Sequence, residues 1–261
     1  MRPVFWMLAF VGFVFLYAPI VVLVVYSFNA SELVTVWGGF SLRWYGALFS
    51  DAQIGQAFRL SLLIAATSAT LAVVLGTMTA LALVRIGGFW GRPILAGMAT
   101  APLVMPEVIT GLSLLLLFVA MERTVGWPAG RGIATVILAH SVFCLAYVAV
   151  VVQSRLLGLE ESLEEAAADL GARPYEVMRD VTLPLIAPAL AAGWLLAFTL
   201  SLDDVVVASF VSGPGASTLP MVIFSKVRLG VSPDVNALAT LIIVAVALGL
   251  IGALILVRRQ R

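Results

Sequence analysis

The sequence predicts an all-α integral membrane protein: a bundle of six transmembrane helices with one polar helix pair on the cytoplasmic side. Three observations support this fold class. Hydrophobic residues make up 62% of the 261-residue chain and charged residues 11%, which is far more apolar than a soluble domain. The apolar residues form long runs. A single polar run, residues 165–184, lies between two of them, and a membrane protein keeps such a run outside lipid.

The apolar runs are long enough to cross a membrane, because a helix needs about 20 apolar residues to span the hydrocarbon core. Six stretches meet this length: 4–28, 60–84, 94–120, 133–152, 185–211 and 237–257. The first is too long for the apolar part of a signal peptide and no clean cleavage site follows it, so we interpret it as a retained anchor helix. We therefore expect one transmembrane domain over residues 1–261, with a polar loop at about 154–184.

The basic residues predict the orientation of this bundle. With the N-terminus in the cytoplasm, the inner side receives Arg2, Arg85, Arg92, Arg155, Arg173, Arg179, Arg258, Arg259 and Arg261. The outer side receives Arg43, Arg59, Arg123, Arg131, Lys226 and Arg228. The excess on the inner side has the sign of the positive-inside rule. Both termini are thus expected in the cytoplasm.

Composition and motifs argue against several other functions. A formal net charge of +1 gives no concentrated basic surface for nucleic acid. Cys144 and His140 lie in one apolar stretch and have no partners at metal-ligand spacing, so we expect no metal site. We expect His140 to bond to a neighbouring helix. The sequence contains no phosphate-binding Gly-Lys-Ser/Thr loop and no convincing catalytic triad, which predicts a chain that is not an enzyme and binds no cofactor itself.

The polar run has the periodicity of a short amphipathic helix. Its apolar positions recur at i, i+3, i+4 and i+7, namely Leu163, Ala166, Ala167 and Leu170. Glu164, Glu165 and Asp169 lie off this stripe, where they can pair with basic residues of a partner. The stripe predicts a docking surface for a soluble protein. The alternative is an amphipathic linker that rests on the membrane surface.

Local signals divide the polar run into two helices. Ser162 stands three residues before Glu165, the spacing of a capping box at a helix start. Gly171 suits the left-handed position that ends a helix, and Pro174 suits the first turn of the next. Glu176 then places a negative charge near that helix's N-terminus. The expected structure is a helix-turn-helix hairpin.

The same run carries a family motif. It contains Glu165-Ala166-Ala167, then Gly171, and ends Val181-Thr182-Leu183-Pro184. This pattern resembles the EAA loop of ABC importer permeases, although Val181 stands where the family more often has Ile. The resemblance implies that the hairpin docks on a separate ATPase, which binds the ATP and Mg²⁺. Glu165, Ala166, Ala167, Gly171, Leu183 and Pro184 are the coupling residues that it implies.

Three carboxylates fall inside predicted spans, where ionisable residues are costly and usually face a cavity or a partner. They are Glu107 in the third span and Asp203 and Asp204 in the fifth. Pro102 and Pro106 could break the third helix beside Glu107. Adjacent helical residues point about 100° apart, so we expect Asp203 and Asp204 to face different surroundings. The alternative role is structural, with the acids bonded to hydroxyls such as those of Ser201 and Thr199, or paired with an arginine.

A second resemblance covers nearly the whole chain. The segments that carry it are 103–111 (LVMPEVITG), 201–204 (SLDD), 212–215 (SGPG) and 236–241 (NALATL). They resemble the polyamine importer permeases, most closely the putrescine-type subunit. The resemblance implies a MetI-like permease in the cell inner membrane, and it makes Glu107, Asp203 and Asp204 candidates for the polyamine path.

The resemblance also implies partners: a second homologous permease that completes a heterodimeric pore, two copies of an ABC ATPase and a periplasmic polyamine-binding protein. A cationic diamine is consistent with acids inside the membrane. Two alternatives stay open. The cargo can be another polyamine, an amino acid or a metal chelate, or the chain can be a membrane scaffold that transports nothing.

Overall fold

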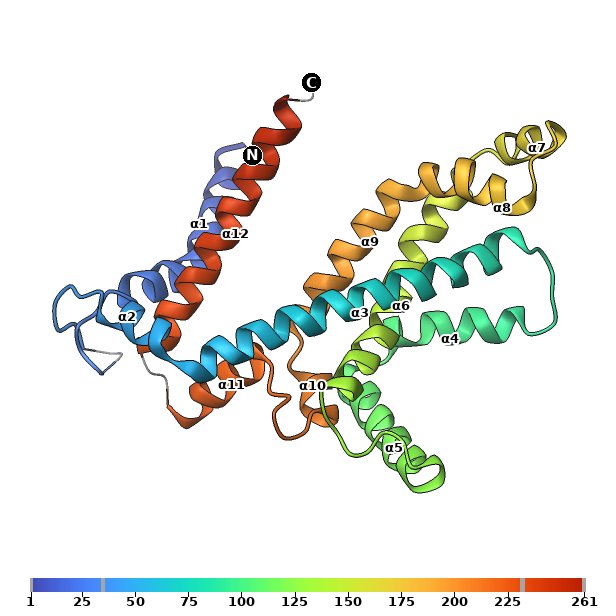
Figure 1. The fold of residues 1–261 in the computed structure, drawn as a ribbon. Helices are drawn as coiled ribbons and strands as arrows, with labels where there is room; N and C mark the ends of the chain where they lie inside the picture. The colour runs from blue at the N-terminus through green and yellow to red at the C-terminus, as the bar shows by residue number, and fades with distance from the viewer. Residues whose placement is uncertain (1, 34–35, 231–232, 260–261) are drawn as a thin grey trace. The chain divides into compact units, whose positions relative to one another are not determined.

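The computed structural model describes residues 2–33, 36–230 and 233–259, and the side chains within 5–33, 36–230 and 233–248. Every regular element in these ranges is a helix, and the backbone pairing of Asn29 with Phe40 is an isolated bridge (Figure 1). The all-α prediction is confirmed. The chain divides into two compact units, Met1–Gln56 with Val222–Arg261 and Ala57–Met221.

The first unit combines the two ends of the chain. Its helices are α1 (Arg2–Tyr26), α2 (Arg43–Ser50) and α12 (Pro233–Arg259), together with the beginning of α3 (Ala52–Arg85) and most of α11 (Leu219–Leu229). α12 packs against both α1 and α2. Near the start of α3, the Lys226 ammonium lies 3.2 Å from the Asp51 carboxylate and 2.7 Å from that of Asp234. Asp51 also accepts the backbone N–H groups of Gln53 and Ile54, and so caps α3.

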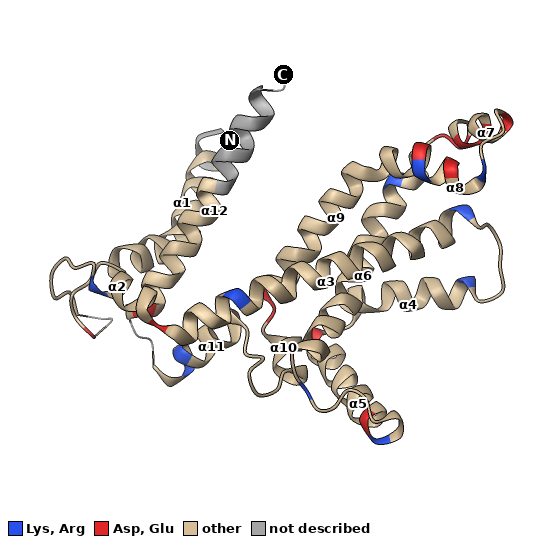
Figure 2. Ribbon diagram, viewed as in Figure 1, with Lys and Arg blue, Asp and Glu red and all other residues tan. Residues whose placement is uncertain are grey.

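The second unit contains the rest of α3 and most of the remaining helices. These are α4 (Arg92–Val104), α5 (Glu107–Val125), α6 (Ile133–Leu157), α7 (Ser162–Asp169), α8 (Pro174–Val177), the π-helical turn η1 (Met178–Thr182), α9 (Leu183–Asp203) and α10 (Val206–Val211). Charged residues concentrate near the ends of these helices, and long stretches between them carry no charge (Figure 2). That distribution is typical of helices that cross lipid.

Small residues hold the helices of the second unit close together. Ala65, Ser68 and Ala69 of α3 are fully buried, and the Ser68 hydroxyl donates to the Ile137 carbonyl of α6 at 3.1 Å. A Cβ at Gly76 of α3 would lie 2.9 Å from the Val148 side chain of α6. Without a hydrophobic driving force between helices in lipid, close backbone approach of this kind supplies the packing energy.

Five helical segments in the described residues are long and apolar enough to cross a membrane: Phe5–Tyr26, Ala52–Arg85, Glu107–Val125, Ile133–Leu157 and Pro174–Asp203. The sixth predicted span, 237–257, falls within α12. Its apolar part is described as far as Leu248, and the side chains of residues 249–257 lie outside the described residues. The count of six transmembrane helices is therefore not confirmed.

Two predicted spans differ from the observed helices. The third was expected as a span over 94–120, but the helix is interrupted between α4 and α5, and the segment long enough to span runs from Glu107 to Val125. The fifth was expected to continue to 211, but α9 ends at Asp203 and the extended residue Asp204 interrupts the helix before α10. In both spans the sequence stays apolar across a point where the helix is interrupted.

Candidate functional site

The break before Glu107 follows from a proline. Pro106 has no backbone N–H and restricts the residue before it, and Met105 accordingly adopts an extended conformation with φ −76° and ψ 135°. α5 then begins at Glu107, whose carboxylate lies in the first turn, where a helix dipole favours negative charge. The expectation that proline could break the third helix is confirmed at Pro106, whereas Pro102 lies inside α4.

The break after Asp203 is organised by Asp204, which is extended, with φ −66° and ψ 129°. The two oxygens of its carboxylate accept the backbone N–H groups of Val207 at 3.2 Å and Ala208 at 2.7 Å. These N–H groups have no carbonyl partner at the start of α10, so the carboxylate satisfies them in the way an N-cap side chain does. Asp204 is buried, with 9% of its surface exposed.

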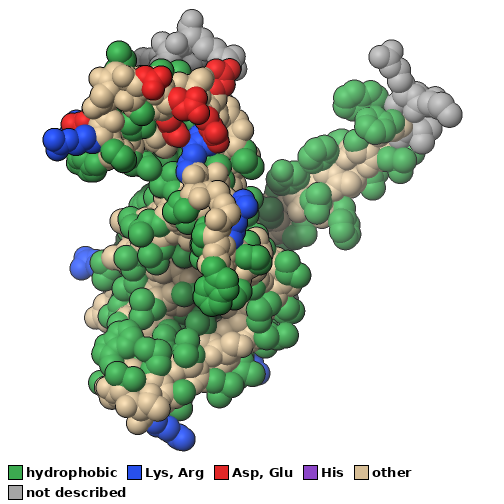
Figure 3. All heavy atoms as spheres, turned by 90° about the vertical axis from the view of Figure 1, so that its right-hand side faces the viewer, with side chains coloured by type: hydrophobic (Ala, Val, Ile, Leu, Met, Phe, Trp, Pro, Cys, Tyr) green, Lys and Arg blue, Asp and Glu red, His purple; other side chains and the backbone are tan. Residues whose placement is uncertain are grey.

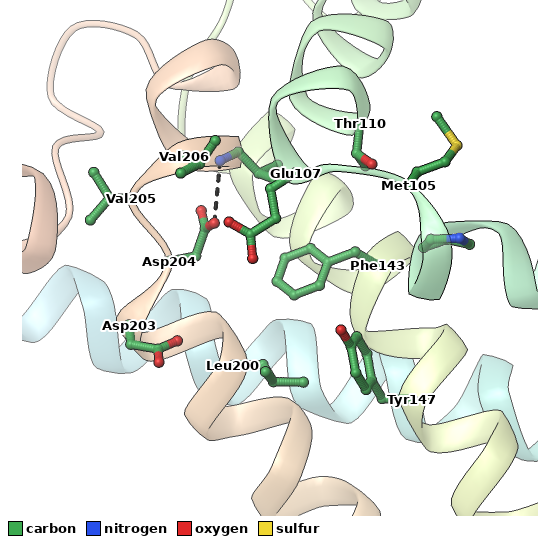
Figure 4. A pocket seen from close by; sticks show the side chains of 12 residues that line it. Met105, Glu107, Thr110, Phe143, Tyr147, Leu200, Asp203, Asp204, Val205 and Val206 are labelled. Carbon is green, nitrogen blue, oxygen red and sulfur yellow. Dashed lines mark hydrogen bonds between the residues drawn. The ribbon is translucent and has the colours of Figure 1, made fainter.

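The two breaks line one cavity of about 310 Å³ (Figure 4). Its wall includes the three acids Glu107, Asp203 and Asp204. Phe143 and Tyr147 line the part of the wall formed by α6. The expectation that Asp203 and Asp204 cannot both line one space is wrong, because it assumed a continuous helix, although Asp204 does contact a neighbouring helix through His140 of α6. Once the helix ends at Asp203, the extended backbone at Asp204 lets both carboxylates line the same space.

A buried network holds Asp204 from behind. His140 of α6 is fully buried; its Nε2 lies 3.2 Å from Oδ2 of Asp204, and its Nδ1 lies 2.7 Å from the Ser201 hydroxyl of α9. The expectation that His140 bonds to a neighbouring helix is confirmed. Among the described residues, no ion pair reaches Glu107 or Asp203. The cavity therefore holds one acid that is anchored in the protein and two that lack a basic partner there.

The polar run forms the predicted hairpin. α7 ends before Gly171, whose φ of +89° is the left-handed conformation that glycine adopts without strain, and α8 begins at Pro174. The capping box at Ser162 and Glu165 is wrong: α7 has no side-chain cap, and the Ser162 hydroxyl instead bonds to the Glu160 carboxylate. The capping contact that does form was not predicted from the sequence: at the start of α8, the Glu176 carboxylate accepts the Arg173 N–H at 2.7 Å.

The hairpin presents its apolar stripe outward. Leu163 is 47% exposed and Leu170 is 91% exposed, so the described chain does not cover this face. Glu165, Ala166 and Gly171 are exposed as well, whereas Leu183 and Pro184 begin α9. Acidic side chains gather at this end of the second unit (Figure 3). Glu164, which we expected to be available to a partner, instead accepts the Thr182 hydroxyl and forms an ion pair with Arg85 within the chain.

No group of three or more histidine, cysteine or carboxylate side chains that could hold a metal ion exists among the described residues. Cys144 is buried as a free thiol. The acidic cavity and the hairpin are the candidate functional sites in the described part of the second unit.

Residues 72–260 match the family model described as the binding-protein-dependent transport system inner membrane component. The putrescine transport system permease protein PotI of Escherichia coli (strain K12) is 63% identical over 241 residues, which cover 92% of this chain and 85% of that protein. The spermidine/putrescine transport system permease protein PotC of the same organism is 44% identical over 232 residues, covering 89% of this chain and 85% of its own length.

Solved structures share the fold. A chain of a bacterial ABC transporter that imports the acidic polysaccharide alginate superposes with a TM-score of 0.74, covering 97% of this chain and 94% of its own, at 16% sequence identity. A chain of the MetNI methionine ABC transporter in inward-facing conformations gives a TM-score of 0.61, covering 76% of this chain and 91% of its own, at 18% identity. At these identities the likeness concerns the fold alone.

Proposed function

The chain belongs to the family of binding-protein-dependent transport system inner membrane components, and from this premise we propose that it is the permease subunit of an ABC importer that carries a polyamine, putrescine first among them. The relatives that support the cargo are the putrescine permease at 63% identity and the spermidine/putrescine permease at 44%. The chain works as a conduit, in which no bond is made or broken.

The acidic cavity is the observation that supports this cargo. A diamine carries two ammonium groups joined by an apolar chain. Glu107 and Asp203 offer two carboxylates without a basic partner among the described residues, and Phe143 and Tyr147 offer aromatic faces to which cations are attracted. Conduction requires release as well as entry, and a site of moderate strength serves both.

The energy source is a separate subunit. We propose that the exposed stripe of the hairpin docks on an ABC ATPase, which holds ATP and Mg²⁺, with Glu165, Ala166 and Ala167 at the contact. Two such ATPases, a second homologous permease and a periplasmic polyamine-binding protein would complete the particle. One structural neighbour, the alginate transporter, is described in complex with a periplasmic protein, and it superposes with a TM-score of 0.71 at 15% identity, covering 95% of this chain and 89% of its own.

The proposed location is the cell inner membrane, with both termini and the hairpin in the cytoplasm. The excess of basic residues on that side supports this orientation. Fusing a reporter that is active on one side of the membrane to the C-terminus, and another to the outer loop after α1, tests it directly. A hairpin accessible from the periplasm would exclude the docking role.

The decisive experiment uses the reconstituted complex in proteoliposomes. Putrescine delivered by the binding protein is expected to accelerate ATP hydrolysis and to accumulate, with spermidine, a neutral amino acid and a metal chelate as competitors. Preferential uptake of one of the last two would replace the cargo, and absence of any uptake would favour a scaffold. Glu165→Arg is expected to uncouple ATP hydrolysis from uptake while delivery of the substrate stays intact, because it places a bulky cation at the docking surface. Normal coupled uptake by this variant would exclude that role.

A further inference from the structure

Arg85 and Glu164 tie the hairpin to the membrane-spanning helices. Arg85 is the last residue of α3, and its Nε lies 3.0 Å from the Glu164 carboxylate on α7. The other oxygen of Glu164 accepts the Thr182 hydroxyl at 2.8 Å, at the end of η1. One acidic side chain of the hairpin thus joins α3 to the turn from which α9 begins.

The contacts of Glu164 with Arg85 and Thr182 are less exposed than those of a surface ion pair. The side chains of Arg85 and Glu164 are 15% and 21% exposed, and Thr182 is 2% exposed. Arg85 also donates to the Leu156 carbonyl at the end of α6, at 3.4 Å, where a cation complements the helix dipole. Its second carboxylate partner, Glu161, lies 3.1 Å away but is 67% exposed. Exposed pairs contribute little, so the partly buried Arg85–Glu164 pair is expected to contribute more to this contact than the exposed Arg85–Glu161 pair.

α9 connects this joint to the acidic cavity. Thr182 precedes its first residue, and Asp203, in the cavity wall, is its last. The helix has 21 residues, so it spans about 30 Å at 1.5 Å per residue. α6 packs along it and carries Phe143 and Tyr147 on the cavity side. Movement of the hairpin therefore has a continuous, packed route to the wall of the cavity.

We propose that Arg85, Glu164 and Thr182 form a clamp that transmits movement of the hairpin to the acidic cavity through α9, with Arg85 and Glu164 as its positioning residues. This inference rests on the proposed function of the hairpin as a docking site. Neither residue contacts the cargo. Without the Arg85–Glu164 contact, α7 keeps its packing on α8 and η1 and the exposed pair with Glu161 but loses its less exposed tie to the end of α3, so movement of the hairpin is carried to α9 less effectively.

The test compares Glu164→Gln and Arg85→Gln with the matched control Glu161→Gln. All three remove one charge, but the control removes only the exposed pair. In proteoliposomes of the assembled complex, the two clamp variants are expected to lower the putrescine imported per ATP hydrolysed by about tenfold, and the control by less than about twofold, the contrast expected between a partly buried and an exposed pair. Because Gln is shorter than Arg but close in shape to Glu, Glu164→Gln is the variant that preserves packing.

A second readout is independent of the cargo. Leu200 lines the cavity from α9, and the native Cys144 is buried, so Leu200→Cys provides an accessible thiol for a maleimide probe. Trapping the ATPase with ADP and vanadate after ATP hydrolysis is expected to change the labelling rate of this thiol in the otherwise unmodified complex, and Glu164→Gln is expected to abolish that change. If the complex imports no putrescine but nucleotide still controls labelling through Glu164, the cargo proposal fails and the clamp stands. Two results would overturn the clamp. One is a clamp variant that assembles and keeps nucleotide-dependent labelling, and the other is labelling that does not depend on nucleotide even in the complex without a clamp substitution.

Discussion

Replacing either adjacent aspartate with asparagine is expected to separate a structural from a transport role. Asp203→Asn removes a charge that has no basic partner among the described residues, and the amide fits the same space. Asp204→Asn removes a charge that three groups contact: the Val207 and Ala208 N–H groups and Nε2 of His140. The two substitutions are chemically identical and one residue apart, so each controls for the other.

The magnitude follows from the hydrogen bonds of Asp204. Its two oxygens accept one backbone N–H each, but an asparagine offers one acceptor oxygen, and its NH₂ cannot accept from the second N–H. A buried donor left without a partner costs about 1–3 kcal/mol, and loss of an N-cap contact costs a similar 0.5–2 kcal/mol or so. Asp204→Asn should therefore destabilise the fold by roughly 1–3 kcal/mol, while Asp203→Asn changes stability by less than about 0.5 kcal/mol.

The assay combines thermal unfolding of the purified complex in lipid nanodiscs with uptake in proteoliposomes. Asp203→Asn is expected to reduce putrescine uptake at an unchanged apparent Tm. Asp204→Asn is expected to reduce both, with the apparent Tm lower by roughly 2–4 °C for each kcal/mol in a chain of this size. Equal thermal stability of the two variants would refute the capping role of Asp204, and full uptake by Asp203→Asn would remove Asp203 from the pathway.

Two further predictions concern packing and pH. Gly111→Ala should lower uptake and apparent Tm, because the new Cβ would lie 2.6 Å from the Phe210 ring of α10, so that ring and helix must shift; an unchanged Tm would contradict this contact. In the first unit, partial burial alone would raise the pKa of Asp51, but bonds from Ile54 and from Lys226 hold it below its usual range. A carboxyl group whose pKa is lower in the folded state stabilises the fold above its unfolded pKa of about 4. This stabilisation is lost as the pH falls through the folded-state pKa. The Tm difference between the native protein and Lys226→Met should therefore shrink below about pH 4, and a constant difference would refute it.

Much of the fold could be predicted from the sequence, because hydropathy and local turn chemistry act over short distances. The starts of the helices at Ile133 and Pro174 and the left-handed Gly171 are such local features. Breaks inside apolar runs are harder, since hydropathy does not change across them. A signal for the interruption did exist at Asp204, because an aspartate just before an apolar run is a typical N-cap. The β-branched Val205 and Val206 that follow it have low helix propensity.

The clamp could not be predicted from the sequence for a different reason. Arg85 and Glu164 are far apart along the chain, and nothing in either local pattern identifies the other as its partner. Arg85 contributed to the sequence prediction only as a positive charge on the inner side. Glu164 was grouped with Glu165 and Asp169 as an acid off the apolar stripe, yet it faces the bundle while Glu165 is exposed. Which of several acids on a short helix turns inward depends on the tertiary contacts available to it.

The helix breaks also explain why the three acids of the cavity are unequal. Glu107 lies in the first turn of α5 and Asp204 caps α10, so each lies near the positive end of a helix dipole. Asp203 is the last residue of α9, at the negative end, where a carboxylate is disfavoured. Its charge is therefore the one that the protein offsets least. If the cavity binds the proposed cargo, we expect Asp203 to be the acid that contributes most to holding an ammonium group.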